Sequence, residues 1–177
     1  MELSKQIKNE IVKDIRVRIF DESFPRIVQC LHLLDPDKIW LKPNKNSNSI
    51  GNLVLHVCGN IRQYVVSGIG GRKDIRERKL EFMENVTTTK ADLISKMDEL
   101  LLDVSNVLDT IEPTDLVEIK EVQGFTMSIT SILIHVTEHL SYHTGQIAFY
   151  TKLLEDTDLK FYGDLDLDIK SDKKNNT

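Results

Sequence analysis

The sequence contains few of the residues that mark several classes of protein. Its 177 residues include only two cysteines, Cys30 and Cys58, which is too few for a disulfide-stabilised secreted protein, so we expect a cytoplasmic location. No apolar run approaches the roughly 20 residues that a transmembrane helix needs, so we expect no membrane association. The first residues alternate charged and apolar side chains, unlike the continuous apolar segment of a signal peptide.

The chain also lacks an excess of positive charge. The chain carries 28 acidic and 23 basic residues, a formal net charge of −5. Nucleic acids bind clustered Lys and Arg, so we do not expect them as partners. A composition of 40% hydrophobic and 29% charged residues is that of a folded globular protein. We assign residues 1–160 to a single domain and residues 161–177 to a charged, flexible C-terminal tail.

Eight glycines and four prolines are few for this length, and most of them lie outside four segments whose apolar residues recur every three or four positions. The segments span residues 3–34, 50–67, 90–111 and 127–154. Pro25 lies inside the first segment, where it either kinks one helix or separates two abutting helices. A connection of roughly 20 residues joins the second and third segments. The pattern therefore predicts an all-α four-helix bundle with a long crossover between helices 2 and 3.

Residues at the edges of these segments predict how the helices begin. Ser49 or Asn48 is expected to cap the second helix and Thr126 the fourth, because a short side-chain oxygen can accept hydrogen bonds from the free N–H groups of the first turn. Residues 116–125 alternate apolar and polar side chains around a Gln-Gly pair, which is typical of a short β-hairpin or an extended strand.

Histidines on the last segment suggest a metal site. His139 and His143 are four residues apart on or beside the apolar stripe, so their imidazoles would project from adjacent turns and could chelate one cation. His135 lies at the edge of the same stripe. The alternative is that the two imidazoles only fill space or form hydrogen bonds inside the core.

His56, on the second segment, is the third candidate ligand. Three neutral imidazoles from two facing helices would leave coordination positions for water or substrate, as in catalytic rather than structural zinc sites. From spacing alone, His56 is equally compatible with an exposed histidine at a helix edge. Asn60 and Gln146 lie on or near the same stripes, where they either orient ligands through hydrogen bonds or are ordinary buried amides.

Three stretches of the sequence resemble the DinB-like (DinB/YfiT-like) superfamily of metalloenzymes. They are residues 49–56, residues 68–74 and residues 135–147, the last ending in the pattern HxxxHxGQI. More narrowly, they resemble an uncharacterised bacterial branch that has this ending. The likeness extends from the first segment to Leu154, and it implies a four-helix bundle with a long second crossover.

The resemblance also implies a metal site and an assembly. It assigns one divalent ion to His56, His139 and His143, with His135 beside the ligands rather than among them. Relatives commonly pair through helices, so a homodimer is expected. Apolar residues outside the main stripe of the second helix, such as Leu55 and Val66, favour the same expectation.

The activity that the resemblance implies is a divalent-metal-dependent one. Characterised relatives include transferases and isomerases that bring a low-molecular-weight thiol to the metal, so we expect a thiol-dependent transferase or a hydrolase. One alternative is a non-catalytic metal-binding stress-response protein, and another is a helical interaction module with structural histidines. The sequence does not name the metal, because imidazole sites accept Ni, Zn, Fe and Mn.

Charged residues near the candidate site also enter the argument. Glu138 lies well round the helix from His139, so neither metal-facing stripe carries a carboxylate, which slightly favours thiol chemistry over base-assisted hydrolysis. Arg72, Arg76 and Arg78 either bind an anionic substrate, since guanidinium pairs bidentately with carboxylate, or form a solvated, salt-bridged face.

Overall fold

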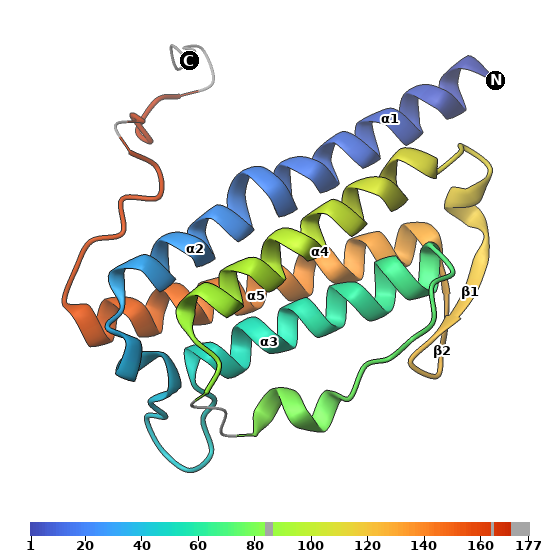
Figure 1. Cartoon of the computed structure of the whole chain (residues 1–177). Helices are drawn as coiled ribbons and strands as arrows, with labels where there is room; N and C mark the ends of the chain where they lie inside the picture. The colour runs from blue at the N-terminus through green and yellow to red at the C-terminus, as the bar shows by residue number, and fades with distance from the viewer. Residues whose placement is uncertain (84–86, 164, 171–177) are drawn as a thin grey trace.

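The computed structural model describes residues 1–83, 87–163 and 165–170, and its main body is a four-helix bundle (Figure 1). The four helical stretches are α1 (Glu2–Arg16) with η1 (Val17–Ser23) and α2 (Phe24–Leu33), α3 (Ile50–Ile61) with η3 (Arg62–Ile69), α4 (Lys90–Thr110), and α5 (Ile129–Glu155). The crossover between α3 and α4 contains a short 3-10 helix, η4 (Arg78–Phe82). The helical bundle expected from the periodicity is therefore confirmed.

The first helical stretch continues through Pro25 without a break. Proline has no N–H group with which to extend the helical ladder, and the turns before it widen to i→i+5 hydrogen bonds in η1. There the N–H of Phe24 bonds the carbonyl of Ile19, and both Ser23 and Phe24 keep helical φ and ψ angles. Of the two alternatives for Pro25, two abutting helices are therefore excluded.

The helix α3 begins as expected, at Ser49. The Ser49 hydroxyl accepts a hydrogen bond from the Asn52 N–H, and the Asn52 side chain accepts one from the Ser49 N–H. The Asn52 amide nitrogen also donates to the carbonyls of Glu81 and Met83, at 2.9 and 2.8 Å. One buried side chain therefore starts α3 and holds the crossover against it.

The expected cap of α5 at Thr126 is wrong. A β-hairpin of β1 (Ile119–Val122) and β2 (Phe125–Ser128) occupies this stretch, and Thr126 pairs with Glu121 in it. The Thr126 hydroxyl donates to the Glu121 carboxylate at 2.6 Å, so it serves the neighbouring strand. Ser128 caps α5 instead, accepting from the N–H of Ser131.

The core lies between the helices, and α5 packs against both α2 and α3. Val66, which was expected to lie outside this core, is only 1% exposed, and Leu55 is half-buried. The reason is that α4 packs against η3 and α3 and covers the second face of that stretch. These two residues therefore give no support to a homodimer, which stays a prediction.

Two further expectations concern the chain as a whole. No helix in the described part of the chain is long and apolar enough to cross a membrane. The start of the expected tail contacts the bundle, since the Arg26 guanidinium lies 5.4 Å from the ring centroids of both Phe161 and Tyr162. The division at residue 160 and the flexibility of the tail stay predictions, and residues 164 and 171–177 lie outside the described residues.

Candidate metal centre

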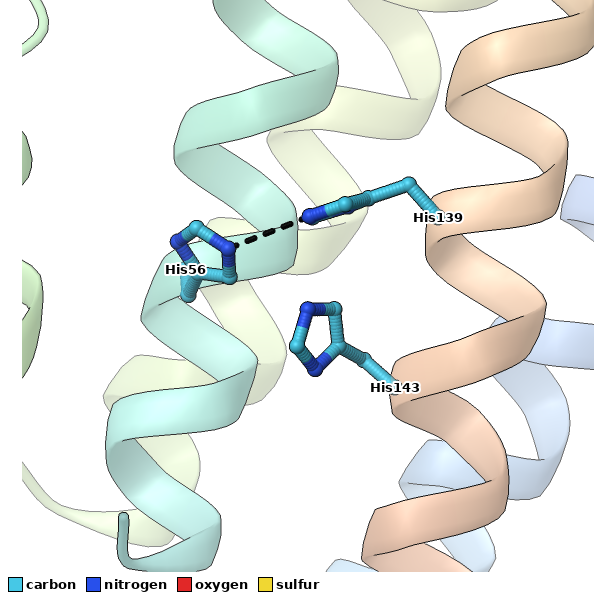
Figure 2. Close-up of side chains that lie close together, drawn as sticks. All are labelled: His56, His139 and His143. Carbon is cyan, nitrogen blue, oxygen red and sulfur yellow. Dashed lines mark hydrogen bonds between the residues drawn. The ribbon is translucent and has the colours of Figure 1, made fainter. Parts of the chain in front are cut away.

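Three histidines from two helices converge in the bundle (Figure 2). His56 comes from α3, and His139 and His143 come from consecutive turns of α5. One ring nitrogen from each lies within 4.8 Å of the others, and the Nε2 atoms of His56 and His139 are 3.2 Å apart. Two nitrogens bound at ~2.1 Å to one tetrahedral ion lie about 3.4 Å apart. The three imidazoles therefore have the spacing that one metal ion requires.

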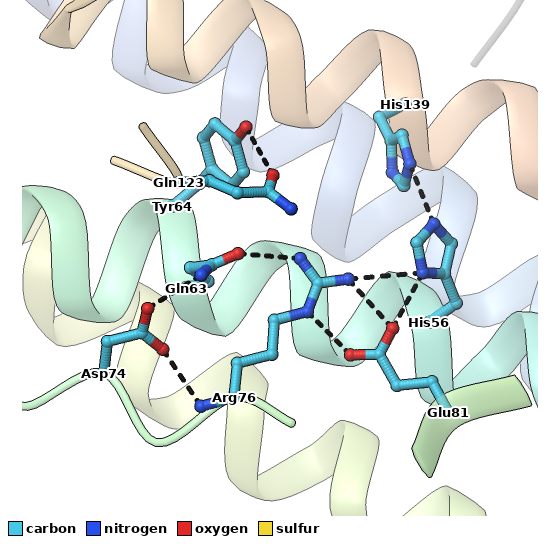
Figure 3. Close-up of polar contacts among 8 residues, drawn as sticks. All are labelled: His56, Gln63, Tyr64, Asp74, Arg76, Glu81, Gln123 and His139. Atoms are coloured by element: carbon cyan, nitrogen blue, oxygen red, sulfur yellow. Dashed lines mark hydrogen bonds and ion pairs between the residues drawn. The ribbon is translucent and has the colours of Figure 1, made fainter. Parts of the chain in front are cut away.

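A buried carboxylate from the crossover holds His56. Glu81 Oε2 lies 2.8 Å from His56 Nδ1, and Arg76 donates to both oxygens of the same carboxylate, at 2.6 and 2.9 Å (Figure 3). The Arg76 guanidinium also donates to Gln63 Oε1 at 2.8 Å. The side chains of Arg76 and Glu81 are only 5% and 9% exposed, so this pair is little screened by water.

The charge of Glu81 decides which nitrogen of His56 carries a proton. Burial alone would raise the pKa of Glu81, but hydrogen bonds from Arg76 and His56 and the charges of both groups lower it below its ordinary value. Glu81 is therefore ionised at neutral pH and can only accept hydrogen bonds. The shorter of the two contacts of His56 Nδ1 is to this carboxylate, at 2.8 Å against 3.2 Å to Arg76 Nη2, so Glu81 favours a proton on Nδ1, which leaves the Nε2 lone pair directed at the other two histidines.

The two α5 histidines are uncharged at neutral pH. Burial, followed by the charges of the neighbouring histidines and Arg76, lowers the pKa of His139 to about 3. Burial also lowers the pKa of His143, whose Nδ1 lies 2.7 Å from Gln146 Oε1. Because an amide oxygen accepts, Nδ1 of His143 carries the proton and Nε2 is free. The neutral rings offer the lone pairs that a metal ion binds.

Of the other residues expected around the site, some contact the candidate ligands and others do not. Gln146 contacts a candidate ligand, as described. Asn60 is 4% exposed, yet its Oδ1 has no hydrogen-bond partner among the described residues. The His135 ring lies against Tyr64, with centroids 4.5 Å apart, and does not join the three converging histidines. Cys58 is buried, and burial raises the pKa of its thiol to about 12, as befits a small apolar residue of the core rather than a metal ligand.

The three arginines of the crossover do not act alike. Arg72 pairs with Asp103 at 2.6 Å, which fits the expected salt-bridged surface. Arg76 is buried against Glu81. It therefore fits neither of the two alternatives, a solvated salt-bridged face or a binding group for an anionic substrate. Arg78 lies over the Phe82 ring, 4.9 Å from its centroid, and has no carboxylate partner within the described residues.

Glu81 and Arg76 could not be found from helical periodicity, because they lie in a crossover that has none. One indirect signal is Gly59, one turn after His56 on the same face of α3. A Cβ at this position would overlap Glu81 Oε1. The glycine therefore makes room for the carboxylate beside the helix.

Two of the converging histidines, His56 and His139, border an open hollow of about 380 Å³. It is lined by His56, Asn60, Tyr64, Arg76, Arg78, Gln123, Phe125, His135 and His139. No Asp or Glu of the described residues lines it. A small molecule in this hollow would therefore reach the histidines past polar, aromatic and cationic side chains.

A comparison with known protein families identifies the family of the chain. The model of the family described as "Protein of unknown function (DUF1572)" matches residues 7–163. The chain belongs to the DUF1572 family. None of the curated proteins matches this member of the family.

Solved structures connect this DUF1572 chain to the DinB-like fold. A DinB-like protein from Bacillus cereus is 15% identical, with a TM-score of 0.63 over 79% of this chain and 90% of that one. The DinB-like protein YjoA from Bacillus subtilis is 18% identical, with a TM-score of 0.63 over 86% of this chain and 96% of that one. The resemblance noted in the sequence is thus confirmed for the fold.

Proposed function

We propose that this protein is a divalent-metal-dependent enzyme in which His56, His139 and His143 hold the ion and a low-molecular-weight thiol is the substrate. One observation carries the proposal. Three imidazole nitrogens converge beside a hollow that no carboxylate of the described residues lines. Three protein ligands leave room for a further ligand, as in catalytic metal sites. Zn, Ni, Fe and Mn all suit the imidazole ligands.

The chain's own residues fix the orientation of the candidate ligands at such a site. A bound divalent cation would lower the pKa of a thiol and keep it as the nucleophilic thiolate. Glu81 and Gln146 fix the proton on Nδ1 of His56 and His143, which aims both Nε2 lone pairs at the same point. Arg76 in turn keeps Glu81 ionised and in place.

The carboxylate of Glu81 does not make the site a hydrolase. General-base hydrolysis needs a carboxylate within hydrogen-bond reach of the attacking water. Glu81 approaches His56 on the Nδ1 side, away from the other histidines, and both its oxygens are engaged by Arg76. This arrangement favours thiol transfer, as the DinB-like resemblance implies, over base-assisted hydrolysis.

The proposal is tested with cobalt. Co²⁺ should bind at one ion per chain, and a small thiol such as 2-mercaptoethanol should produce a sulfur-to-metal charge-transfer band that saturates with thiol. The loaded protein should then accelerate conjugation of that thiol to a test electrophile such as 1-chloro-2,4-dinitrobenzene. If the metal binds and no thiol alters the spectrum, the transferase is refuted and the non-catalytic metal-binding protein takes its place. If no metal binds, both are refuted.

We also propose a homodimer, formed through α5. The exposed apolar side chains Tyr142, Phe149 and Leu153 are 64, 70 and 65% exposed, and their spacing puts them on one stripe of the helix. A second copy packing on this stripe would cover all three. Phe149→Lys should then convert a dimer to a monomer in light scattering, whereas a wild-type monomer would refute the proposal.

A further inference from the structure

The hollow beside the three histidines contains buried polar groups that no protein group satisfies. Asn60 is 4% exposed and lines the hollow, and its Oδ1 has no partner among the described residues. His135 lines the same hollow, and its buried Nε2 also has no partner there. An unpaired buried polar atom costs about 1–3 kcal/mol, so such atoms are rare unless a ligand or water completes them.

Hydrogen-bond donors surround the same space. The Tyr64 hydroxyl donates to Gln123 Oε1 at 2.8 Å, which turns the Gln123 amide nitrogen away from Tyr64 (Figure 3). Arg78 also lines the hollow. Its guanidinium rests on the Phe82 ring rather than on a carboxylate of the described residues. Two side chains from the hairpin turn and the crossover thus present free N–H groups.

The balance of charge in the hollow is positive. Arg76 is neutralised by Glu81, and the described part of the chain contributes no other carboxylate to the walls. The guanidinium of Arg78 therefore has no carboxylate partner among the described residues, and a divalent ion at the histidines would add further positive charge. A hollow that holds a guanidinium and the amide nitrogen of Gln123, and that no carboxylate of the described residues lines, attracts an anion that accepts hydrogen bonds.

We propose that this hollow is a subsite for a carboxylate group on the molecule whose reacting atom reaches the metal. Arg78 pairs with the carboxylate, and Gln123 donates an amide N–H group to it. The inference rests on the proposed function, because it assumes a metal at the three histidines, and it narrows the substrate to an anionic compound. A volume of about 380 Å³ suits a small molecule.

The test uses protein loaded with Co²⁺ and two probes that differ by one charge. These are the monohydroxamate of succinic acid and the methyl ester of the same compound. Both should bind cobalt through the hydroxamate, so neither depends on thiol chemistry. Dissociation constants come from titration of the cobalt absorption spectrum. In the wild-type protein, the acid should bind about tenfold more tightly than the ester, as expected for a charge-assisted hydrogen bond.

Three variants test which residue causes the preference for the acid over the ester. Arg78→Gln should bring the two affinities within about twofold of each other and leave the affinity for the ester unchanged. Gln123→Glu, which adds a carboxylate to the exposed hairpin turn, should make the ester the tighter ligand. Lys79→Gln is the matched control, because it removes the same charge from η4 at a residue that does not line the hollow, and it should keep the wild-type ratio.

The outcomes separate the subsite from the metal centre. Equal affinities for acid and ester in the wild-type protein would overturn the subsite while the metal centre stands. An unchanged ratio in Arg78→Gln, or an equal loss in Lys79→Gln, would overturn it too, because the preference would then come from general electrostatics. A protein that binds no cobalt would refute the metal centre and the subsite together.

Discussion

Replacing Glu81 with Gln is expected to weaken metal binding although Glu81 touches no metal. The glutamine amide oxygen can still accept from His56 Nδ1, so the geometry at 2.8 Å is preserved and only the charge is lost. A hydrogen bond to a charged group contributes about 1.5–3 kcal/mol and a neutral one about 0.5–1.5 kcal/mol. The difference of about 1–1.5 kcal/mol corresponds to roughly tenfold weaker binding, within the range seen when partners of metal-bound histidines are removed.

The same substitution also affects stability, and the two effects must be separated. Arg76 stays buried without its anion, but it still donates to Gln63 and to the new amide oxygen. We therefore expect a loss of about 1–3 kcal/mol in the free energy of unfolding, less than the 3–5 kcal/mol of a buried charge left unpaired. Adding Arg76→Met removes that charge and should recover stability without recovering metal affinity.

The assay is competition for Zn²⁺ against a chromophoric chelator at neutral pH, alongside urea unfolding of the metal-free protein. Glu77→Gln serves as control, because it removes the same charge from an exposed residue of the crossover. An unchanged zinc affinity in Glu81→Gln would refute the role of Glu81 in orienting His56. Restored affinity in the double variant would show that the loss came from the unpaired arginine instead.

Three further predictions concern other parts of the site. His143→Ala should abolish tight metal binding and His135→Ala should leave one ion per chain, as measured by metal analysis; equal losses would show that His135 is a ligand. The metal-free protein should lose stability as the pH falls from 6.5 towards about 3, since the unfolded chain takes up a proton that folded His139 refuses; a His139→Gln variant with the same dependence of its urea midpoint on pH would contradict this. Gly59→Ala should weaken zinc binding by displacing the crossover carboxylate, whereas Gly145→Ala, which meets open space on α5, should raise the unfolding free energy by about 0.5–1 kcal/mol; zinc titration and urea unfolding of both variants decide it.

The sequence predicted the parts of the molecule that depend on local periodicity. The helix boundaries agree within a few residues, and the i, i+4 spacing of His139 and His143 placed both on the side of α5 that faces α3. Ser49 capped α3 as expected because capping is a local interaction.

What the sequence did not predict depends on contacts between distant segments. Glu81 reaches His56 because Asn52 holds the crossover against α3, and no spacing rule relates a residue in an irregular segment to a helix 25 positions earlier. Thr126 was assigned to the helix because a Thr before an apolar run suits a cap. Its hydroxyl instead donates a hydrogen bond to Glu121 on the partner strand.

Because Asn52 attaches the crossover to α3, metal binding is thermodynamically coupled to local unfolding of the crossover. Glu81 orients His56 only while η4 lies against α3, so a conformation with the crossover detached has a weaker metal site. By thermodynamic linkage, a metal that binds the attached conformation more tightly must lower the population of the detached one by the same factor. Amide hydrogens of η4 should therefore exchange more slowly in the metal-loaded protein, although no residue of η4 is among the three candidate ligands.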